Sequence, residues 1–256
     1  MRIGFLVKWA RVGAFVFALT VFCYLPRVFA ARPLATDDAG TVEKGAFEGE
    51  FGVEYVKASD NETNLSVVIK TGILDNLDLG VEIPYLFIDS KEESDTDGLS
   101  DVCICMKLNI LNEHSVFPDT ALTFNYKSDS GNDRKALGTG RPGFDLTAVF
   151  SKSFDPLTCH LNIGYSFRKD FDNEDNKDAF TYGFAVEYPL NDTINLVGEI
   201  TGETELEGEF NDNSCGALIG FNYAFNDMVT FDLGVATAIS RAEPDLKVTA
   251  GVTIAL

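Results

Sequence analysis

Hydrophobic and polar side chains alternate with a strict period of two along residues 45–57, GAFEGEFGVEYVK. Apolar side chains and one glycine occupy the odd positions from Phe47 to Tyr55, whereas Glu48, Glu50 and Glu54 occupy even positions. Successive side chains of a β-strand point to opposite faces of the sheet. The segment therefore predicts a strand with one apolar face and one acidic face.

The same alternation recurs along the chain until its last residue, and each segment spans roughly the 9–11 residues that a tilted transmembrane strand needs. The eleven further segments are 64–73, 77–87, 101–111, 120–127, 143–151, 158–168, 179–188, 193–201, 215–225, 228–237 and 245–256. In the third segment, Pro84 cannot donate a ladder hydrogen bond, which predicts a bulge or local bend there.

The connections between these segments fall into two alternating classes. The odd-numbered ones are longer and polar: 58–63, 88–100, 128–142, 169–178, 202–213 and 239–244. Most even-numbered ones are tight and rich in Asn and Asp, which tolerate the backbone angles of turns: 74–76, 152–157, 190–192 and 226–227, with 112–119 as an exception. Outer-membrane barrels have short turns on one side and long loops on the other. A soluble β-sandwich, the alternative, has no reason to segregate its loops in this way.

Aromatic side chains on the apolar face gather near both ends of the expected strands, as at the two interfaces of a membrane. Tyr85, Phe87 and Tyr126 are examples near the long loops, and Phe47, Tyr188 and Tyr223 near the short turns. The sequence therefore predicts an all-β fold, a transmembrane antiparallel up-and-down β-barrel of about 12 strands over residues 45–256. Its expected location is the outer membrane of a Gram-negative bacterium.

The first 30 residues have the features of a cleaved secretory signal peptide. Arg2, Lys8 and Arg11 precede an apolar run over residues 12–25, and Ala30 supplies the small residue at the expected cleavage site. The run is shorter than the roughly 20 apolar residues of a spanning helix, so a membrane anchor is the less favoured alternative. Cleavage lowers the formal net charge from −20 to −24, which excludes nucleic acid as a natural partner.

Residues 31–44 form an acidic segment between the signal peptide and the first strand. It carries Asp37, Asp38 and Glu43. The segment can fold into the lumen as a constriction or hang in the periplasm, and disorder is the default for a terminal segment. The sequence leaves both alternatives open.

Four cysteines remain after processing, and an even number in an exported chain suggests disulfides. Cys103 and Cys105 share one face of one strand, however, and Cys159 and Cys215 fall on the apolar face of two distant strands. We expect small, unpaired side chains. The sequence contains no metal-ligand spacing, phosphate loop or dinucleotide fingerprint, so no cofactor and no metal site are expected.

Several stretches resemble a known family. They are RPLATDDAGTVEKGAFEGE (residues 32–50), LDLGVEIPYLF (77–87) and GLSDVCICMKLNIL (98–111), with weaker matches in LNIGYSF (161–167) and LVGEITGE (196–203). The chain resembles the phenol-degradation (meta-pathway) outer-membrane transporter family of Gram-negative bacteria. The resemblance implies a barrel of this size and the passage of small molecules; the family's phenol link is an association and identifies no substrate.

The face opposite the apolar one would line the barrel interior. The candidate pore-lining residues are Glu48, Glu50, Glu54, Lys70, Asp78, Glu82, Asp101, Lys107, Asp145, His160, Arg168, Glu187, Glu199, Asp232 and Lys247. Acids outnumber bases two to one when Lys127 is included, so some acids should contact water. This composition favours a water-filled, mildly cation-favouring channel for passive uptake of small molecules, with aromatic or hydrophobic compounds among the candidates. The alternative is a non-conducting structural or surface-interaction barrel filled by its own side chains.

Two further functions can be weighed from the sequence. Outer-membrane phospholipases use a Ser/His pair on the lipid-facing surface, but His114 lies in a turn and His160 on the inward face, so no enzyme is expected. The loop runs EESDTD (92–97), DFDNED (170–175) and ETELEGEFND (203–212) are acidic. Calcium or magnesium ions there could bridge to lipopolysaccharide and outer-membrane lipid, although a solvated acidic surface is the favoured interpretation. The transported solute and the oligomeric state do not follow from the sequence.

Overall fold

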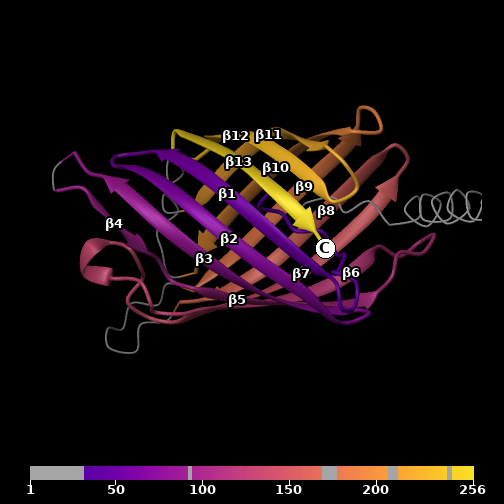
Figure 1. The fold of residues 1–256 in the computed structure, drawn as a ribbon, viewed down its shortest axis with the longest axis horizontal. Helices are drawn as coiled ribbons and strands as arrows, with labels where there is room; N and C mark the ends of the chain where they lie inside the picture. Colours follow the sequence, from indigo (N-terminus) through magenta and orange to yellow (C-terminus); the bar gives the residue numbers. More distant parts are fainter. Residues whose placement is uncertain (1–31, 92–93, 169–177, 207–212, 241–243) are drawn as a thin grey trace, which may run out of the picture.

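The computed structural model describes residues 32–91, 94–168, 178–206, 213–240 and 244–256 (Figure 1). The predicted signal peptide and most of the acidic loop runs lie outside the described residues. None of the helices in the described part of the chain is long or apolar enough to span a membrane.

Thirteen strands and one short 3-10 helix, η1 (Asp133–Lys135), make up the regular structure of the described residues. The strands are β1 (Phe47–Lys57), β2 (Asn61–Leu74), β3 (Leu77–Asp89), β4 (Thr96–Leu99), β5 (Cys103–Leu111), β6 (Asp119–Lys127), β7 (Gly143–Phe154), β8 (Leu157–Phe167), β9 (Ala179–Pro189), β10 (Ile194–Glu205), β11 (Ser214–Ala224), β12 (Val229–Ala238) and β13 (Leu246–Ala255).

The sheet closes on itself, and all its strand pairs are antiparallel. Strand β1 pairs with its neighbour β2 on one edge and with the last strand β13 on the other, from Glu48 opposite Ala255 to Lys57 opposite Leu246. The strands run obliquely around the wall (Figure 1). The result is a closed 12-stranded barrel with β4 as an addition, which confirms the predicted fold.

Pro84 marks a bulge, but the extra residue lies in the partner strand. Between the pair Glu82–Cys103 and the pair Tyr85–Leu99, β3 advances three residues while the partner chain advances four. Strands β4 and β5 therefore act as one long strand interrupted near Asp101. The N and O atoms of one residue in an antiparallel strand point to the same neighbour. Those of Pro84 point away from β2, so the β2–β3 ladder continues through Pro84 without a shift. The Pro84 oxygen faces the β4–β5 side, where it accepts from the Ser100 N–H at 3.0 Å.

Several of the expected connections are shorter than predicted, among them 58–63 and 152–157. Strand β2 begins at Asn61 and β7 ends at Phe154, so the connections 58–60 and 155–156 are tight turns. Backbone pairing continues past the residues at which the alternation of side chains ends. The longer connection at 112–118 is attached to β7 through an ion pair between Glu113 Oε1 and Lys152 Nζ at 2.9 Å. The hydrogen bond from Lys152 holds the pKa of the Glu113 carboxyl below its usual range.

The barrel reverses the usual distribution of polar and apolar side chains in a soluble protein. Apolar side chains such as Phe51, Ile69 and Phe184 are about half exposed on the outer face, whereas polar ones such as Glu50, Asp232 and Thr253 are buried inside. This is the distribution of a wall with lipid outside and a polar lumen within. The protein is therefore located in the outer membrane.

A charge on the outer face should destabilise this barrel in proportion to its depth in the membrane. Ile163 lies in the middle of β8 and is 40% exposed. We predict that Ile163→Arg lowers the free energy of unfolding in lipid vesicles by about 2–4 kcal/mol, measured by urea titration of heat-modifiable gel mobility. Leu190→Arg is the matched control because Leu190 lies in a turn and is also exposed. Equal losses in both variants would contradict the lipid-facing assignment.

Candidate functional site

The lumen is the candidate functional site, and its wall is built from the alternate residues of every strand. Each strand contributes a row of inward side chains because neighbouring positions point to opposite faces. On β5 the inward row is Cys103, Cys105, Lys107 and Asn109, with Asp101 just before the strand. The row runs from the long-loop end of the barrel to the short-turn end, which faces the periplasm in outer-membrane barrels.

The N-terminal segment Arg32–Lys44 lies inside this lumen. Its carboxyl end is held where Lys44 forms an isolated bridge with Gly72 of β2 and the Gly45 N–H donates to the Gly72 oxygen at 2.8 Å. Ala39 is completely buried and packs in one cluster with Ala121 of β6 and Val149 of β7. The segment therefore crosses the barrel interior rather than extending away from it.

Carboxylates of the wall hold the backbone of this segment. Glu199 of β10 accepts from the Ala35 N–H at 2.9 and 3.0 Å and from the Thr36 N–H at 2.8 Å. Asp78 of β3 accepts from the Val42 N–H at 3.0 Å. Hydrogen bonds to a charged acceptor are among the stronger ones in proteins. Peptide groups of the segment therefore stabilise both acids.

Cationic and amide side chains of β5 donate to oxygen atoms of the same segment. Lys107 Nζ lies 2.7 Å from Asp37 Oδ1 and donates to the Asp38 backbone oxygen at 3.0 Å. Asn109 donates to the Ala39 oxygen at 2.9 Å. The segment is held from β3, β5 and β10, so both its donors and its acceptors are matched by the wall.

The beginning of the segment lies against β12 and β13. Arg32 Nε is 3.7 Å from Asp232 Oδ1, and Arg32 Nη2 donates to Thr249 Oγ1 at 2.8 Å. Pro33 approaches the wall closely at two glycines. A Cβ added at Gly234 would lie 2.9 Å from Pro33 Cβ, and one at Gly220 would lie 2.8 Å from Pro33 Cγ. Larger side chains at these positions would displace the segment.

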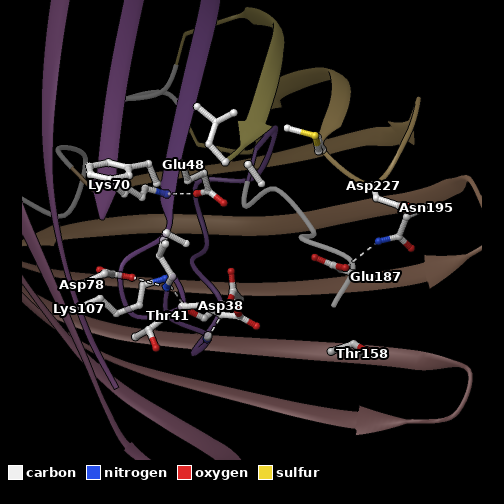
Figure 2. A pocket seen from close by; sticks show the side chains of 18 of the residues that line it. Asp38, Thr41, Glu48, Lys70, Asp78, Lys107, Thr158, Glu187, Asn195 and Asp227 are labelled. Carbon is white, nitrogen blue, oxygen red and sulfur yellow. Dashed lines mark hydrogen bonds and ion pairs between the residues drawn. The ribbon is translucent and has the colours of Figure 1, made fainter. Parts of the chain in front are cut away.

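A chamber of about 610 Å³ remains beside the segment. Met228, Ala255 and Leu256 border it at the short-turn end, so it opens toward the periplasm. Figure 2 shows Lys70, Asp78 and Lys107 on one side of the chamber and the Glu187–Asn195 pair on the other. Its charged lining residues are Asp38, Glu43, Glu48, Lys70, Asp78, Lys107, Glu187 and Asp227. Six acids against two bases leave the chamber acidic.

Lys70 is the cation of a compact cluster on this wall. Its Nζ forms an ion pair with Glu50 and lies 3.3 Å from Glu48 Oε1. One lysine therefore faces two carboxylates, so the cluster keeps a net negative charge. Glu48 and Lys70 line the chamber directly, so this charge faces the space through which a solute would pass.

Ser151, His160 and Glu187 form a polar chain across β7, β8 and β9. Ser151 Oγ lies 2.8 Å from His160 Nδ1, and His160 Nε2 lies 3.5 Å from Glu187 Oε1. A hydrolase uses similar groups, but here the serine oxygen also accepts from the Ala39 N–H at 2.9 Å. Asn195 Nδ2 in turn donates to Glu187 Oε2 at 2.7 Å. This polar chain anchors the N-terminal segment through the contact between Ser151 and Ala39.

Three of the sequence-predicted positions lie toward the long-loop end and away from the chamber. Asp101 is 1% exposed and accepts from the Gly131 N–H and the Thr139 N–H, both at 2.8 Å, so it attaches the loop between β6 and β7. Arg168 is exposed and pairs with Glu203 at 2.6 Å. Lys247 lies 3.6 Å from Glu54.

The remaining candidates lie on inward-facing rows: Glu82 and Asp145 are partly buried, and Asp232 faces Arg32. Sequence reasoning missed Arg32, Ala35, Thr36 and Ser151 as functional contacts. The RPLATDDAGTV opening, residues 32–42, was a signal for the first three but not for Ser151. Backbone donors such as the Ala35 and Thr36 N–H groups carry no mark in the sequence. Among the described residues, no group of three or more His, Cys, Asp or Glu side chains could hold a metal ion.

Comparison with known proteins identifies relatives of this architecture. The model of a family described as "Putative MetA-pathway of phenol degradation" matches residues 30–256. No curated protein matches the sequence. Among solved structures, an outer membrane channel from Pseudomonas putida F1 superimposes with a TM-score of 0.69 at 14% identity, covering 87% of this chain and 100% of that one.

Two other solved structures share the fold at lower similarity. The NanC porin has a TM-score of 0.57 at 10% identity and covers 81% of this chain and 98% of its own. The CymD monoaromatic hydrocarbon channel has a TM-score of 0.50 at 10% identity, over 84% and 88% of the two chains. At these identities the likeness establishes the barrel architecture.

The contacts of Glu199 should control the order of the N-terminal segment. Removing this carboxylate takes away a charged acceptor whose hydrogen bonds contribute about 1.5–3 kcal/mol. We predict that Glu199→Ala speeds amide hydrogen exchange at Ala35 and Thr36 at least about tenfold, measured by mass spectrometry of the 32–44 peptide. Glu54→Ala is the control, because Glu54 pairs with Lys247. Unchanged exchange in Glu199→Ala would show that other contacts hold the segment.

Proposed function

This chain belongs to the family described as "Putative MetA-pathway of phenol degradation", and from that premise we propose that it is an outer-membrane channel for passive uptake of small molecules. The proposed solutes include aromatic or hydrophobic compounds, and the channel favours cations mildly. Its solved relatives in the same fold are outer-membrane channels and porins. The observation that carries the proposal is the acidic chamber left open beside the N-terminal segment.

The size and lining of the chamber suit a small solute. Its volume of about 610 Å³ lies within the roughly 300–1,000 Å³ of small-molecule sites. The chamber is lined both by apolar side chains, including Phe47, Met228 and Leu256, and by polar ones, including Thr158, His160 and Asn195. A ring carrying one hydroxyl would find an apolar surface and hydrogen-bonding partners in the same space. The monoaromatic hydrocarbon channel among the relatives supports this class of solute.

The charge of the lumen supports a preference for cations. The chamber has six acids and two bases, and the wall beside it has two glutamates for Lys70. A negative potential concentrates cations and excludes anions in a narrow, low-dielectric passage. The pore-lining role of the inward residues is part of this proposal.

Neutralising the Glu48–Glu50 pair should reduce this preference. Two charges at about 5 Å from the permeation path together contribute on the order of 1 kcal/mol in a water-filled lumen, where salt screens them. We predict that Glu48→Gln with Glu50→Gln lowers the cation-to-anion permeability ratio roughly fivefold, measured from reversal potentials in planar bilayers. Asp75→Asn is the control, because Asp75 lies exposed in a periplasmic turn. An anion preference in the unmodified protein would refute the assignment of the inward face.

The second candidate is a non-conducting structural barrel, and one observation favours it. The N-terminal segment fills part of the lumen, with Thr36 and Ala39 almost completely buried. A silent protein could therefore be a filled barrel or a channel that the segment closes.

Deleting residues 32–42 separates these two possibilities, because it leaves the Lys44–Gly72 bridge and β1 intact. For a channel narrowed by this segment, single-channel conductance should rise severalfold, because the resistance of a pore falls as its cross-section grows. The measurement uses variants whose heat-modifiable mobility shows that they are folded. A folded deletion variant without conductance would support the structural barrel.

A further inference from the structure

Two thiols face each other on the inner wall, and neither contributes to the contacts of the N-terminal segment described above. Cys103 Sγ and Cys105 Sγ are 3.7 Å apart, and both residues are partly exposed. They lie on the inward row of β5, in register with Glu82 and Gly80 of β3. The four cysteines of the described residues are all free, and Cys159 and Cys215 lie on the outward rows of β8 and β11.

The geometry of one strand disfavours a disulfide between these two cysteines. Residues i and i+2 of a strand are about 6.6 Å apart, at the far limit of the Cα–Cα separations that disulfides span. A bridge would therefore be strained and easily reduced. Cys159 and Cys215 face away from the lumen, so they offer no alternative partner. The pair consequently keeps two thiols that solvent in the lumen can reach.

The separation of the two sulfurs matches the coordination sphere of a tetrahedral metal ion. Zinc–thiolate bonds of about 2.3 Å at tetrahedral angles place two sulfurs about 3.8 Å apart. The observed 3.7 Å is close to this value, so an ion could bind without movement of the backbone. Thiolates select soft ions such as Cu(I) and Zn(II) over Mg(II) or Ca(II).

We propose that Cys103 and Cys105 form a lumenal binding site for a soft, thiolate-seeking d¹⁰ cation. The protein supplies two thiolates, each of which releases its proton to solvent, and water completes the coordination. Among the described residues, no third His, Cys, Asp or Glu side chain completes this ligand set. The Glu82 carboxylate beside Cys103 in the β3–β5 register and the acidic lumen favour the entry of a cation.

The site faces the lumen on the long-loop side of the contacts that β5 makes with the N-terminal segment. Along β5, the thiols lie between Asp101 and Lys107. Asp101 accepts a hydrogen bond from the loop of residues 131–139, and Lys107 binds Asp37 of the N-terminal segment. An ion bound there would narrow the route from the long-loop side to the segment. This consequence rests on the proposed channel function, whereas the binding itself does not.

Cadmium is the probe for the binding test, because thiolate–cadmium bonds have a charge-transfer absorption in the ultraviolet. The reduced, detergent-extracted mature protein should bind one Cd²⁺ per chain, release two protons, and show this absorption even with a hundredfold excess of Mg²⁺. Cys103→Ser with Cys105→Ser should lose the absorption and bind Cd²⁺ at least a hundredfold more weakly. Cys159→Ser with Cys215→Ser, the matched control on the outer face, should bind as the unmodified protein does.

Two outcomes would overturn the proposal, provided that heat-modifiable mobility shows the variants to be folded. One is absorption that survives in the Cys103/Cys105 variant, and the other is the absence of binding to the unmodified protein. Planar-bilayer recordings supply the second readout, in which micromolar Cd²⁺ should block the unmodified protein and the outer-face control but not the lumenal variant. A protein that binds Cd²⁺ but stays silent even after deletion of residues 32–42 would refute the channel alone, and one that conducts without binding would refute the thiol site alone.

Discussion

Closure of the sheet between β1 and β13 is the constraint on which the rest of this structure depends. A backbone N–H or C=O left unpaired in hydrocarbon costs several kcal/mol, so a sheet can span a membrane only without free edges. The ten register pairs from Glu48–Ala255 to Lys57–Leu246 remove the last edge. Once the ring is closed, every second side chain must enter an interior of fixed size, whatever its charge.

The charge balance of that interior explains the position of the N-terminal segment. The inward rows carry more acids than bases, and acids enclosed without partners are costly. Arg32 faces Asp232. The peptide N–H groups of Ala35 and Thr36 donate to Glu199, and that of Val42 donates to Asp78. An acidic segment can enter an acidic lumen because its backbone donates and because Lys107 binds its Asp37. The lumen is therefore both a candidate passage and the binding site of the chain's own end.

Several features of the fold could be predicted because they depend on local pattern. Alternation placed Glu48, Lys70 and Glu199 on inward rows, and Pro84 indicated an irregularity that the structure shows in the partner strand. Other features could not be predicted because they depend on pairing. Strand β4 lies in a polar loop without alternation, and it forms because β3 continues past Glu82 and offers it an edge. In the sequence Asp101 resembles any other inward carboxylate, yet it accepts a hydrogen bond from Gly131, thirty residues later in the chain.

The sequence by itself determined the class of the protein: an exported chain, twelve amphipathic strands, a lipid face and an acidic inner face, because a period of two is a property of each strand alone. Only the tertiary structure decided where residues 32–44 lie, which acids peptide groups stabilise and how large a chamber remains. These depend on distances across a closed ring between residues as far as 218 positions apart, such as Arg32 and Ala250. The alternation of side chains specifies the face on which a residue lies, and closure specifies which residues it meets there.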